Sequence, residues 1–346
     1  MKKIILIFLM MSILVYGDIN SEFIKAFESG NIPLVKSLLN KGADINTVNN
    51  FGGSALTVSL RNNRKTLAKF LLEKGIDIHK IEMIPGVEDE TYYKSAFIIA
   101  TEQNDTEMMR LLLKKGAKIS YQPGCDGSPM LTASKNNNVE AIKLLIEMGA
   151  DVNEKVREGH TPLLNAACYN SMEVAKILIE EGADVNEKAY GRTALLWALG
   201  TGSEKTALLL IEKGADIFAK SEHTEYSFLN HEDGNSALHF ASAQNLKNVV
   251  VLLVERGLDV NYKNFNGETP LHVANSELVS LLVENGSNVN EKNNQGVTRL
   301  HRDAWDGKWD VVNYLLNNKA SIDAISNEGE TPLMYAIEEG EFKTVK

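Results

Sequence analysis

The sequence predicts an all-α solenoid of stacked helix–turn–helix units joined by short β-turn or hairpin fingers. One observation is a hydroxyl residue that opens a helical segment about every 33 residues. Another is the pair of short apolar-periodic segments that follows each hydroxyl, and most units end in a glycine-containing turn. Such a fixed period is typical of repeat proteins, in which each unit packs only on its neighbours. The opening hydroxyls are Ser21, Ser54, Ser95, Ser128, Thr161, Thr193, Ser236, Thr269, Thr298 and Thr331.

The unit at residues 161–186, TPLLNAACYNSMEVAKILIEEGADVN, shows why each element is expected. Thr161 is placed as a helix N-cap, and Pro162 occupies the first helical position, where its missing N–H does no harm. Asn170 lies at the break between the two helices, and Gly182 supplies the left-handed residue that ends the second. Neither helix is long enough to be stable alone, so stability must come from stacking.

These residues resemble the ankyrin repeat. The motifs are TPLL at residues 161–164, SALH at 236–239, TPLH at 269–272 and TPLM at 331–334, together with repeated endings such as KGADIN at 41–46. The resemblance covers residues 19–346 and implies about ten repeats, the last one incomplete, in an array at residues 18–346. It also implies that His239, His272 and His301, which share one motif position, are structural and tie each finger to the adjacent helix.

Departures from the period mark individual features. Two long steps predict enlarged fingers at residues 80–94 and 221–235, which are either binding elements or tolerated surface insertions. The second contains metal-capable side chains such as His223 and His231, but without any recognised ligand spacing, so a solvated polar loop is expected. The short step from Thr269 to Thr298 predicts a clipped connection between the two helices of one repeat.

Beside the clipped repeat, Asp303 stands where most repeats have alanine, so its carboxylate would be partly buried and would need a partner. Arg302, His301 or space opened by the clipped repeat is expected to relieve it. Asp303 and the nearby Trp305, Asp306 and Trp309 form either a local site or a local repacking of the array, and we expect the repacking.

Composition and motifs argue against catalysis. No nucleophile elbow, dinucleotide fingerprint, phosphate loop or metal motif occurs, so no enzyme, cofactor or small-molecule substrate is expected. The net charge of −10 leaves no basic excess for nucleic acid. A protein partner is therefore the expected ligand, and the chain is predicted to be an interaction scaffold.

The first 17 residues have the pattern of a signal peptide. Lys2 and Lys3 precede an apolar run at residues 4–16, which is shorter than the about 20 residues that a membrane span needs. We expect export to the periplasm or the medium, with no membrane association after cleavage. The sequence also favours a bacterial origin. An uncleaved N-terminal anchor is the alternative.

In ankyrin-like arrays, the finger tips and the exposed ends of the first helices line a binding groove. Exposed aromatic and arginine side chains at such positions are the types that most often anchor interfaces. Each aromatic side chain could equally pack on its own finger. The last repeat stops early, and an alternative function is a recruiting arm whose catalytic or receptor domain lies beyond residue 346. The candidate partner-binding residues are Phe51, Arg61, Tyr169, Tyr190, Arg192, Gln244, Phe265 and Trp305.

Overall fold

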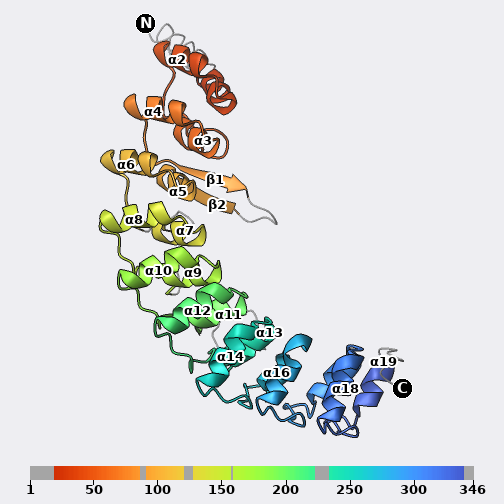
Figure 1. The fold of residues 1–346 in the computed structure, drawn as a ribbon. Coiled ribbons are helices and arrows are strands. Elements are labelled where there is room, and N and C mark those ends of the chain that lie inside the picture. The colour runs from red at the N-terminus through yellow and green to blue at the C-terminus, as the bar shows by residue number, and fades with distance from the viewer. Residues whose placement is uncertain (1–18, 86–90, 121–127, 157–158, 223–233, 339–346) are drawn as a thin grey trace. The chain divides into compact units, whose positions relative to one another are not determined.

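The computed structural model describes residues 19–85, 91–120, 128–156, 159–222 and 234–338. The chain forms two compact units, Met1–Asp151 and Val152–Lys346. Within each unit the helices follow one another as antiparallel pairs in chain order (Figure 1). The predicted all-α solenoid with short hairpin fingers is confirmed.

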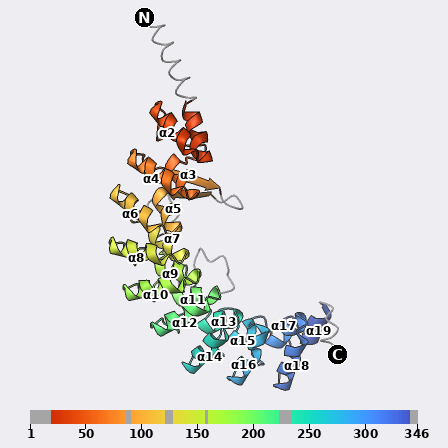
Figure 2. The same ribbon diagram turned by 45° about the horizontal axis from the view of Figure 1, so that its top comes forward.

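The N-terminal unit begins with helical residues 19–29. Its first helices stack on one another, as α3 does on α5 and α5 on α7, and its second helices form the other layer. The hairpin of the first enlarged finger projects from the helices in both views (Figures 1 and 2). The elements are α2 (Ile32–Asn40), α3 (Ala55–Arg61), α4 (Lys65–Glu73), β1 (Ile81–Pro85), β2 (Thr91–Ser95), α5 (Ala96–Glu102), α6 (Thr106–Lys114), α7 (Pro129–Lys135) and α8 (Val139–Glu147).

The C-terminal unit repeats the arrangement, with first helices stacked from α9 to α19 and second helices α10, α12 and α14 stacked beside them. The elements are α9 (Pro162–Cys168), α10 (Met172–Glu180), β3 (Lys188–Ala189), β4 (Arg192–Thr193), α11 (Ala194–Gly200), α12 (Glu204–Glu212), α13 (Ala237–Ala243), α14 (Lys247–Glu255), α15 (Pro270–Val273), η1 (Ser276–Leu278), α16 (Val279–Glu284), α17 (Arg299–Trp305), α18 (Trp309–Asn317) and α19 (Pro332–Glu338).

The predicted caps and turns are present. Thr161 Oγ1 accepts from the Leu164 N–H at 3.3 Å, and Ser54 Oγ accepts from the Thr57 N–H at 3.2 Å. Gly182 ends its helix with φ of 92°. The prediction for the first repeat is wrong in detail, because Ser21 lies inside helical residues 19–29 and therefore does not open that helix.

The three motif histidines brace the fingers, as the resemblance implied. His239 Nδ1 accepts from the Ser236 N–H at 3.3 Å, while Nε2 reaches the carbonyl of Glu268 in the next finger at 2.9 Å. His272 and His301 make the same bonds to their own caps and to the following finger. Burial lowers the pKa of His239 to about 4, so the imidazole is neutral at pH 7 with its proton on Nε2.

The clipped repeat is confirmed and its compensation differs from the prediction. Helix α15 has four residues and gives way directly to η1 and α16. Asp303 is 1% exposed, and its partner is Arg299 on the same helix, not Arg302 or His301. Arg302 instead donates to the carbonyl of His272 at 2.8 Å. Arg299 stands where TPLH-type repeats have proline, so the motif itself gives no expectation of a cation at this position.

The structure describes the two predicted enlarged fingers to different extents. The first forms a regular antiparallel hairpin in which Ile81 pairs with Ser95 and Met83 with Tyr93. Of the second, residues 223–233, including His223 and His231, lie outside the described residues. The two ends of this second finger are joined by a hydrogen bond in which the Ser221 N–H donates to the Asn235 carbonyl at 3.0 Å.

Candidate protein-binding surfaces

The predicted partner-binding residues fall into two local groups and three isolated positions. Phe51 and Arg61 belong to one repeat of the N-terminal unit. Tyr190 and Arg192 lie in one short finger of the C-terminal unit, and Gln244 lies at the end of α13 near them. The remaining three are each in a different repeat of that unit, namely Tyr169, Phe265 and Trp305.

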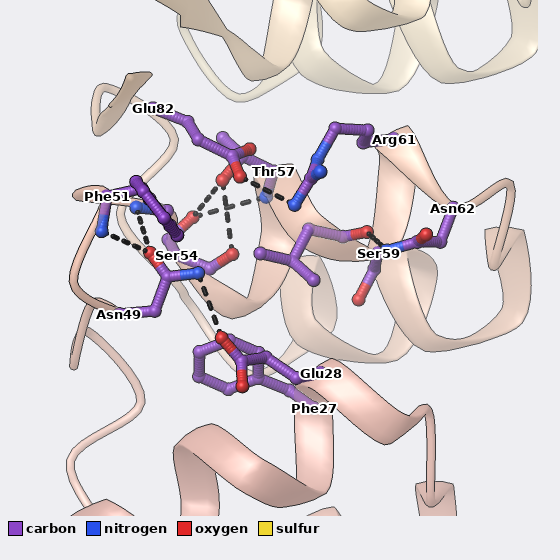
Figure 3. Close-up of polar contacts among 12 residues, drawn as sticks. Phe27, Glu28, Asn49, Phe51, Ser54, Thr57, Ser59, Arg61, Asn62 and Glu82 are labelled. Atoms are coloured by element: carbon purple, nitrogen blue, oxygen red, sulfur yellow. Dashed lines mark hydrogen bonds and ion pairs between the residues drawn. The ribbon is translucent and has the colours of Figure 1, made fainter. Parts of the chain in front are cut away.

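The finger that carries Phe51 is shaped by one asparagine. Asn49 Oδ1 accepts from the N–H groups of Phe51 at 3.0 Å and Gly53 at 2.9 Å, while Asn49 Nδ2 donates to Glu28 at 3.1 Å (Figure 3). A side-chain amide that bonds to the backbone two residues on stabilises a turn in this way. The turn therefore has a defined conformation, and it leaves the Phe51 ring 46% exposed.

The enlarged finger holds Phe51 from the other side. The Met83 N–H of strand β1 donates to the Phe51 carbonyl at 2.8 Å. A long finger thus supports the tip of a shorter one within the N-terminal unit. The exposed aromatic ring consequently stands on backbone that is bonded through both its N–H and its carbonyl.

Arg61 is anchored by a buried carboxylate from the same hairpin. Its Nη2 lies 2.9 Å from Glu82 Oε1, and the Glu82 side chain is 2% exposed whereas that of Arg61 is 44% exposed (Figure 3). Burial raises the pKa of Glu82, and the Arg61 guanidinium opposes part of that rise. Glu82 therefore fixes one edge of the Arg61 guanidinium, while the Arg61 side chain remains partly exposed to solvent.

The approach of Glu82 depends on Gly53. A Cβ atom at Gly53 would stand 2.8 Å from Glu82 Oε1 and 3.0 Å from Asn49 Oδ1. No side chain fits there without displacing one of these groups. The pair Gly53 and Glu82 thus couples the turn of Phe51 to the position of Arg61.

In the C-terminal unit, Arg192 lies between two aromatic rings. Its guanidinium carbon is 4.9 Å from the ring centres of both Trp197 and Phe240. Tyr190 packs edge-on against Trp197 at 6.4 Å and against His160 at 5.8 Å. We call Arg192, Trp197, Phe240, Tyr190 and His160 the aromatic cluster. Trp197 and Phe240 contact the Arg192 guanidinium, and Tyr190 links Trp197 to His160.

Tyr190 has an unusual backbone conformation. It and Gly191 form the two-residue turn between β3 and β4, and Tyr190 has φ of 53°. Such turns favour glycine, which has no Cβ, or asparagine, whose short polar side chain tolerates positive φ. A bulky aromatic residue here therefore carries a backbone strain that the contacts with Trp197 and His160 offset.

The isolated residues have different surroundings. Phe265 is 67% exposed, yet its ring lies so close to Gly234 that a Cβ there would be 2.7 Å from the ring. Trp305 is 39% exposed and packs edge-on against Tyr335 at 5.9 Å. Tyr169 is half exposed at the end of α9. In the second local group, Gln244 is exposed at the end of α13.

Sequence reasoning missed several supporting residues. Trp197 and Phe240 lie inside first helices, where an aromatic residue is indistinguishable from core in the sequence. Glu82 lies in an insertion that was recognised, but its burial depends on how the hairpin folds over Gly53. For Tyr190 a signal was available, because Tyr-Gly replaces the expected Asn-Gly or Asp-Gly pair.

Among the described residues, no group of three or more His, Cys, Asp or Glu side chains is arranged to hold a metal ion. Within the same ranges, no helix has the length and apolar character required to cross a bilayer.

Comparisons with known proteins agree with this architecture. A family model described as "Ankyrin repeats (3 copies)" matches at residues 23–123, 81–156, 130–221, 222–293 and 275–346. The chain is similar to the crystal structure of the human ASB11 ankyrin repeat domain, with a TM-score of 0.56 and 25% identity, over 66% of this chain and 99% of that one.

Curated relatives match over shorter stretches. A putative ankyrin repeat protein of Fowlpox virus, FPV223, is 29% identical over 128 residues, which is 36% of this chain and 89% of the viral protein. Protein phosphatase 1 regulatory subunit 12A of Mus musculus is 46% identical over 43 residues. That match spans 12% of this chain and only 4% of the mouse protein.

Proposed function

Because the chain belongs to the ankyrin repeat family, whose members are generally protein–protein interaction modules, we propose that it is a non-enzymatic scaffold. It binds a partner protein through finger tips and the ends of first helices. The mature array spans residues 18–346, and neither nucleic acid nor a small-molecule substrate is its ligand.

One observation carries this proposal: large aromatic side chains are exposed at finger tips and first-helix ends. Phe51, Tyr169, Phe265 and Trp305 range from 39% to 67% exposed. Exposed aromatic rings on a defined backbone lose little conformational entropy when a partner covers them, and they dominate many interfaces. Arg61 and Arg192 add guanidinium groups that are already oriented by Glu82 and by the aromatic cluster.

A photo-crosslinking experiment identifies the partner and tests the surface together. Benzoylphenylalanine is placed singly at Phe51, Tyr169, Phe265 or Trp305 in the full chain. The controls are Leu34 and Met148, which are similarly exposed at 40% and 45% but lie on a second helix and just after one. The same protein should be captured from at least two of the four positions and from neither control.

A combined alanine variant then measures the surface. Substitution of Phe51, Tyr169, Tyr190, Phe265 and Trp305 should weaken binding of the captured protein by at least about a hundredfold, since single anchors are each worth about 2 kcal/mol or more. Circular dichroism should show an intact helical array. Unchanged affinity would remove these residues from the interface.

For localisation, we propose export with cleavage after residue 17. The support is the basic start and the short apolar run at residues 4–16. Mass spectrometry of protein recovered from producing cells should give Asp18 as the mature N-terminus. Recovery of the intact N-terminal segment in the membrane fraction would favour the uncleaved anchor instead.

A further inference from the structure

Adjacent repeats of the C-terminal unit are linked by a recurring asparagine in the loop after each second helix. Its Oδ1 accepts from a backbone N–H in the corresponding loop of the next repeat. The links are Asn153 to Asp184 at 2.9 Å, Asn186 to Asp216 at 2.8 Å, Asn261 to Asn288 at 2.8 Å and Asn290 to Ser321 at 2.7 Å.

A second recurring link lies beside the first. The lysine two residues after the asparagine pairs with a glutamate in the next loop, as Lys155 does with Glu187 at 2.7 Å and Lys263 with Glu291 at 2.8 Å. Two junctions, from Asn153 to Asp184 and from Asn261 to Asn288, therefore supply two side-chain acceptors each, an amide oxygen and a carboxylate.

The junction between the loops that follow α12 and α14 has neither acceptor. Phe218 replaces the asparagine, and Tyr262 replaces the glutamate. Among the described residues, no bond from the Asp259 N–H and no ion pair of Lys220 is found. The Lys220 ammonium instead stands 3.8 Å from the centre of the Tyr262 ring.

A cavity occupies this junction. Its volume is about 210 Å³, and its lining includes Ile217, Phe218, Lys220, Leu258, Asp259 and Tyr262. Phe218, which forms part of the lining, is 61% exposed. Leu258 also departs from the pattern, since the equivalent residues after α10 and α12 are Ala183 and Ala215.

The size of the cavity restricts its ligand. Pockets for whole small molecules are typically about 300–1,000 Å³. A volume of about 210 Å³ is roughly seven times the share of one water molecule in the liquid, which suits a single large side chain. The walls are mainly aliphatic and aromatic, so that side chain is apolar.

We propose that this cavity is a second docking site, which takes an apolar side chain of an acidic partner peptide. The peptide's neighbouring carboxylate supplies the two missing acceptor contacts, to Lys220 Nζ and to the Asp259 N–H. The Asp259 carboxylate does not prevent this, because it accepts from the Asn261 N–H at 2.8 Å. In an ordinary junction the equivalent Asp184 likewise coexists with the nearby carboxylate of Glu187.

The site is separate from the surface of the proposed function. Phe218 and Tyr262 lie in loops after second helices, whereas the proposed interface uses finger tips and first-helix ends. Loss of one surface should leave the other intact, so each proposal fails or stands independently.

Amide NMR spectra of the full chain test the site with defined probes. The probes are N-acetyl-Phe-Asp-amide and N-acetyl-Asp-Phe-amide, each titrated to about 10 mM. At least one should shift the Asp259 amide resonance saturably, and its Asn-containing counterpart should bind at least about fivefold more weakly, as expected for a charge-assisted bond. No shift at Asp259, or equal binding of acid and amide, overturns the proposal.

A repair variant provides the matched control. Phe218→Asn with Tyr262→Glu restores both ordinary links, so it should fold with a thermal midpoint equal to or above the parent. Probe binding should fall at least tenfold. Retained binding in the folded repair variant overturns the proposal.

A single substitution gives an independent readout. Lys220→Gln keeps the aromatic walls and removes the cation. Its affinity for the acidic probe should fall to that for the Asn-containing probe, so the preference for a carboxylate disappears. A preference that persists in Lys220→Gln contradicts the assigned role of Lys220.

Discussion

Arg299 and Asp303 form a buried bidentate ion pair on α17. Arg299 Nε lies 2.6 Å from Asp303 Oδ2, and Nη2 lies 3.0 Å from Oδ1. Nη1 donates to the carbonyls of Leu271 and Ala274 at 2.7 and 2.6 Å. Those carbonyls belong to the clipped repeat, where α15 ends after four residues and cannot satisfy them within a longer helix. The pair therefore replaces helical hydrogen bonds that the deletion removed.

Asp303→Ala should lower the free energy of unfolding by about 3–5 kcal/mol, because it leaves the Arg299 charge buried without a counter-ion. Arg299→Pro should be similarly harmful by stranding the Asp303 carboxylate. The double variant matches the Pro and Ala of other repeats, as at Pro162 and Ala166, and removes both charges. The double variant should lose less free energy of unfolding than either single variant, about 1–3 kcal/mol, because only the α15 carbonyls lose their donors.

Chemical denaturation, with hydrogen exchange in α15 and α17 as the local readout, measures this cycle. Exchange is needed because repeats can unfold separately in a solenoid. Additive effects of the two substitutions would show that the pair is not coupled.

The sequence predicted features that arise within one repeat. The helix caps and the Gly182 turn follow from short-range chemistry, whereas the histidine braces follow from the resemblance to the ankyrin repeat, and each is present. The Arg299–Asp303 pair was not predicted, although the two residues are four apart on one helix, a spacing that allows an ion pair.

Apart from the histidine braces, the features that join different repeats were not predicted. Glu82 looks like a solvated residue until the hairpin brings it against Gly53 and Arg61. Phe218 and Tyr262 meet only when two loops from successive repeats are stacked. Sequence periodicity shows which residues are unusual, whereas packing determines which unusual residues come together.

His239 should make stability depend on pH. Its pKa is about 4 in the folded chain and near 6.5 when unfolded, so the unfolded state takes up a proton that the folded state excludes. This contribution to stability is complete above pH 6.5 and falls by roughly 3 kcal/mol as the pH drops to 4. The pKa values of His272 and His301 are also lowered by burial, so they act in the same direction.

His239→Leu tests that contribution, because Leu164 and Leu196 occupy the same position in other repeats. Urea unfolding between pH 4 and pH 8 should show a shallower decrease below pH 6.5 in this variant. Above pH 7 it should be less stable than the parent by about 1–2 kcal/mol, because the bond to the Glu268 carbonyl is lost. An unchanged slope would indicate that His239 is not the titrating group.

Gly53→Ala should separate Glu82 from Arg61. The new Cβ would stand 2.8 Å from Glu82 Oε1, so the carboxylate must move, and overpacking of this kind typically destabilises by about 1–3 kcal/mol. Glu82→Ala combined with Gly53→Ala creates room for the methyl group. A double-mutant cycle in thermal unfolding should therefore show that Gly53→Ala is less harmful when Glu82 is absent. Equal effects in both backgrounds would show that the close approach is not the source of the penalty.

Substitutions at Tyr190 should distinguish its role in partner binding from its role in stability. Tyr190→Asn places a residue that tolerates φ of 53° in the β3–β4 turn, which relieves about 1 kcal/mol of backbone strain. It also removes the ring contacts with Trp197 and His160, worth about 0.5–1.5 kcal/mol each, so the net change in stability should be small. Affinity for the partner captured by crosslinking should nevertheless fall by about tenfold or more.

Tyr190→Phe keeps the ring and the strain, so it should bind like the parent. If Tyr190→Asn binds as tightly as Tyr190→Phe, the ring serves the fold alone and Tyr190 is not part of the interface.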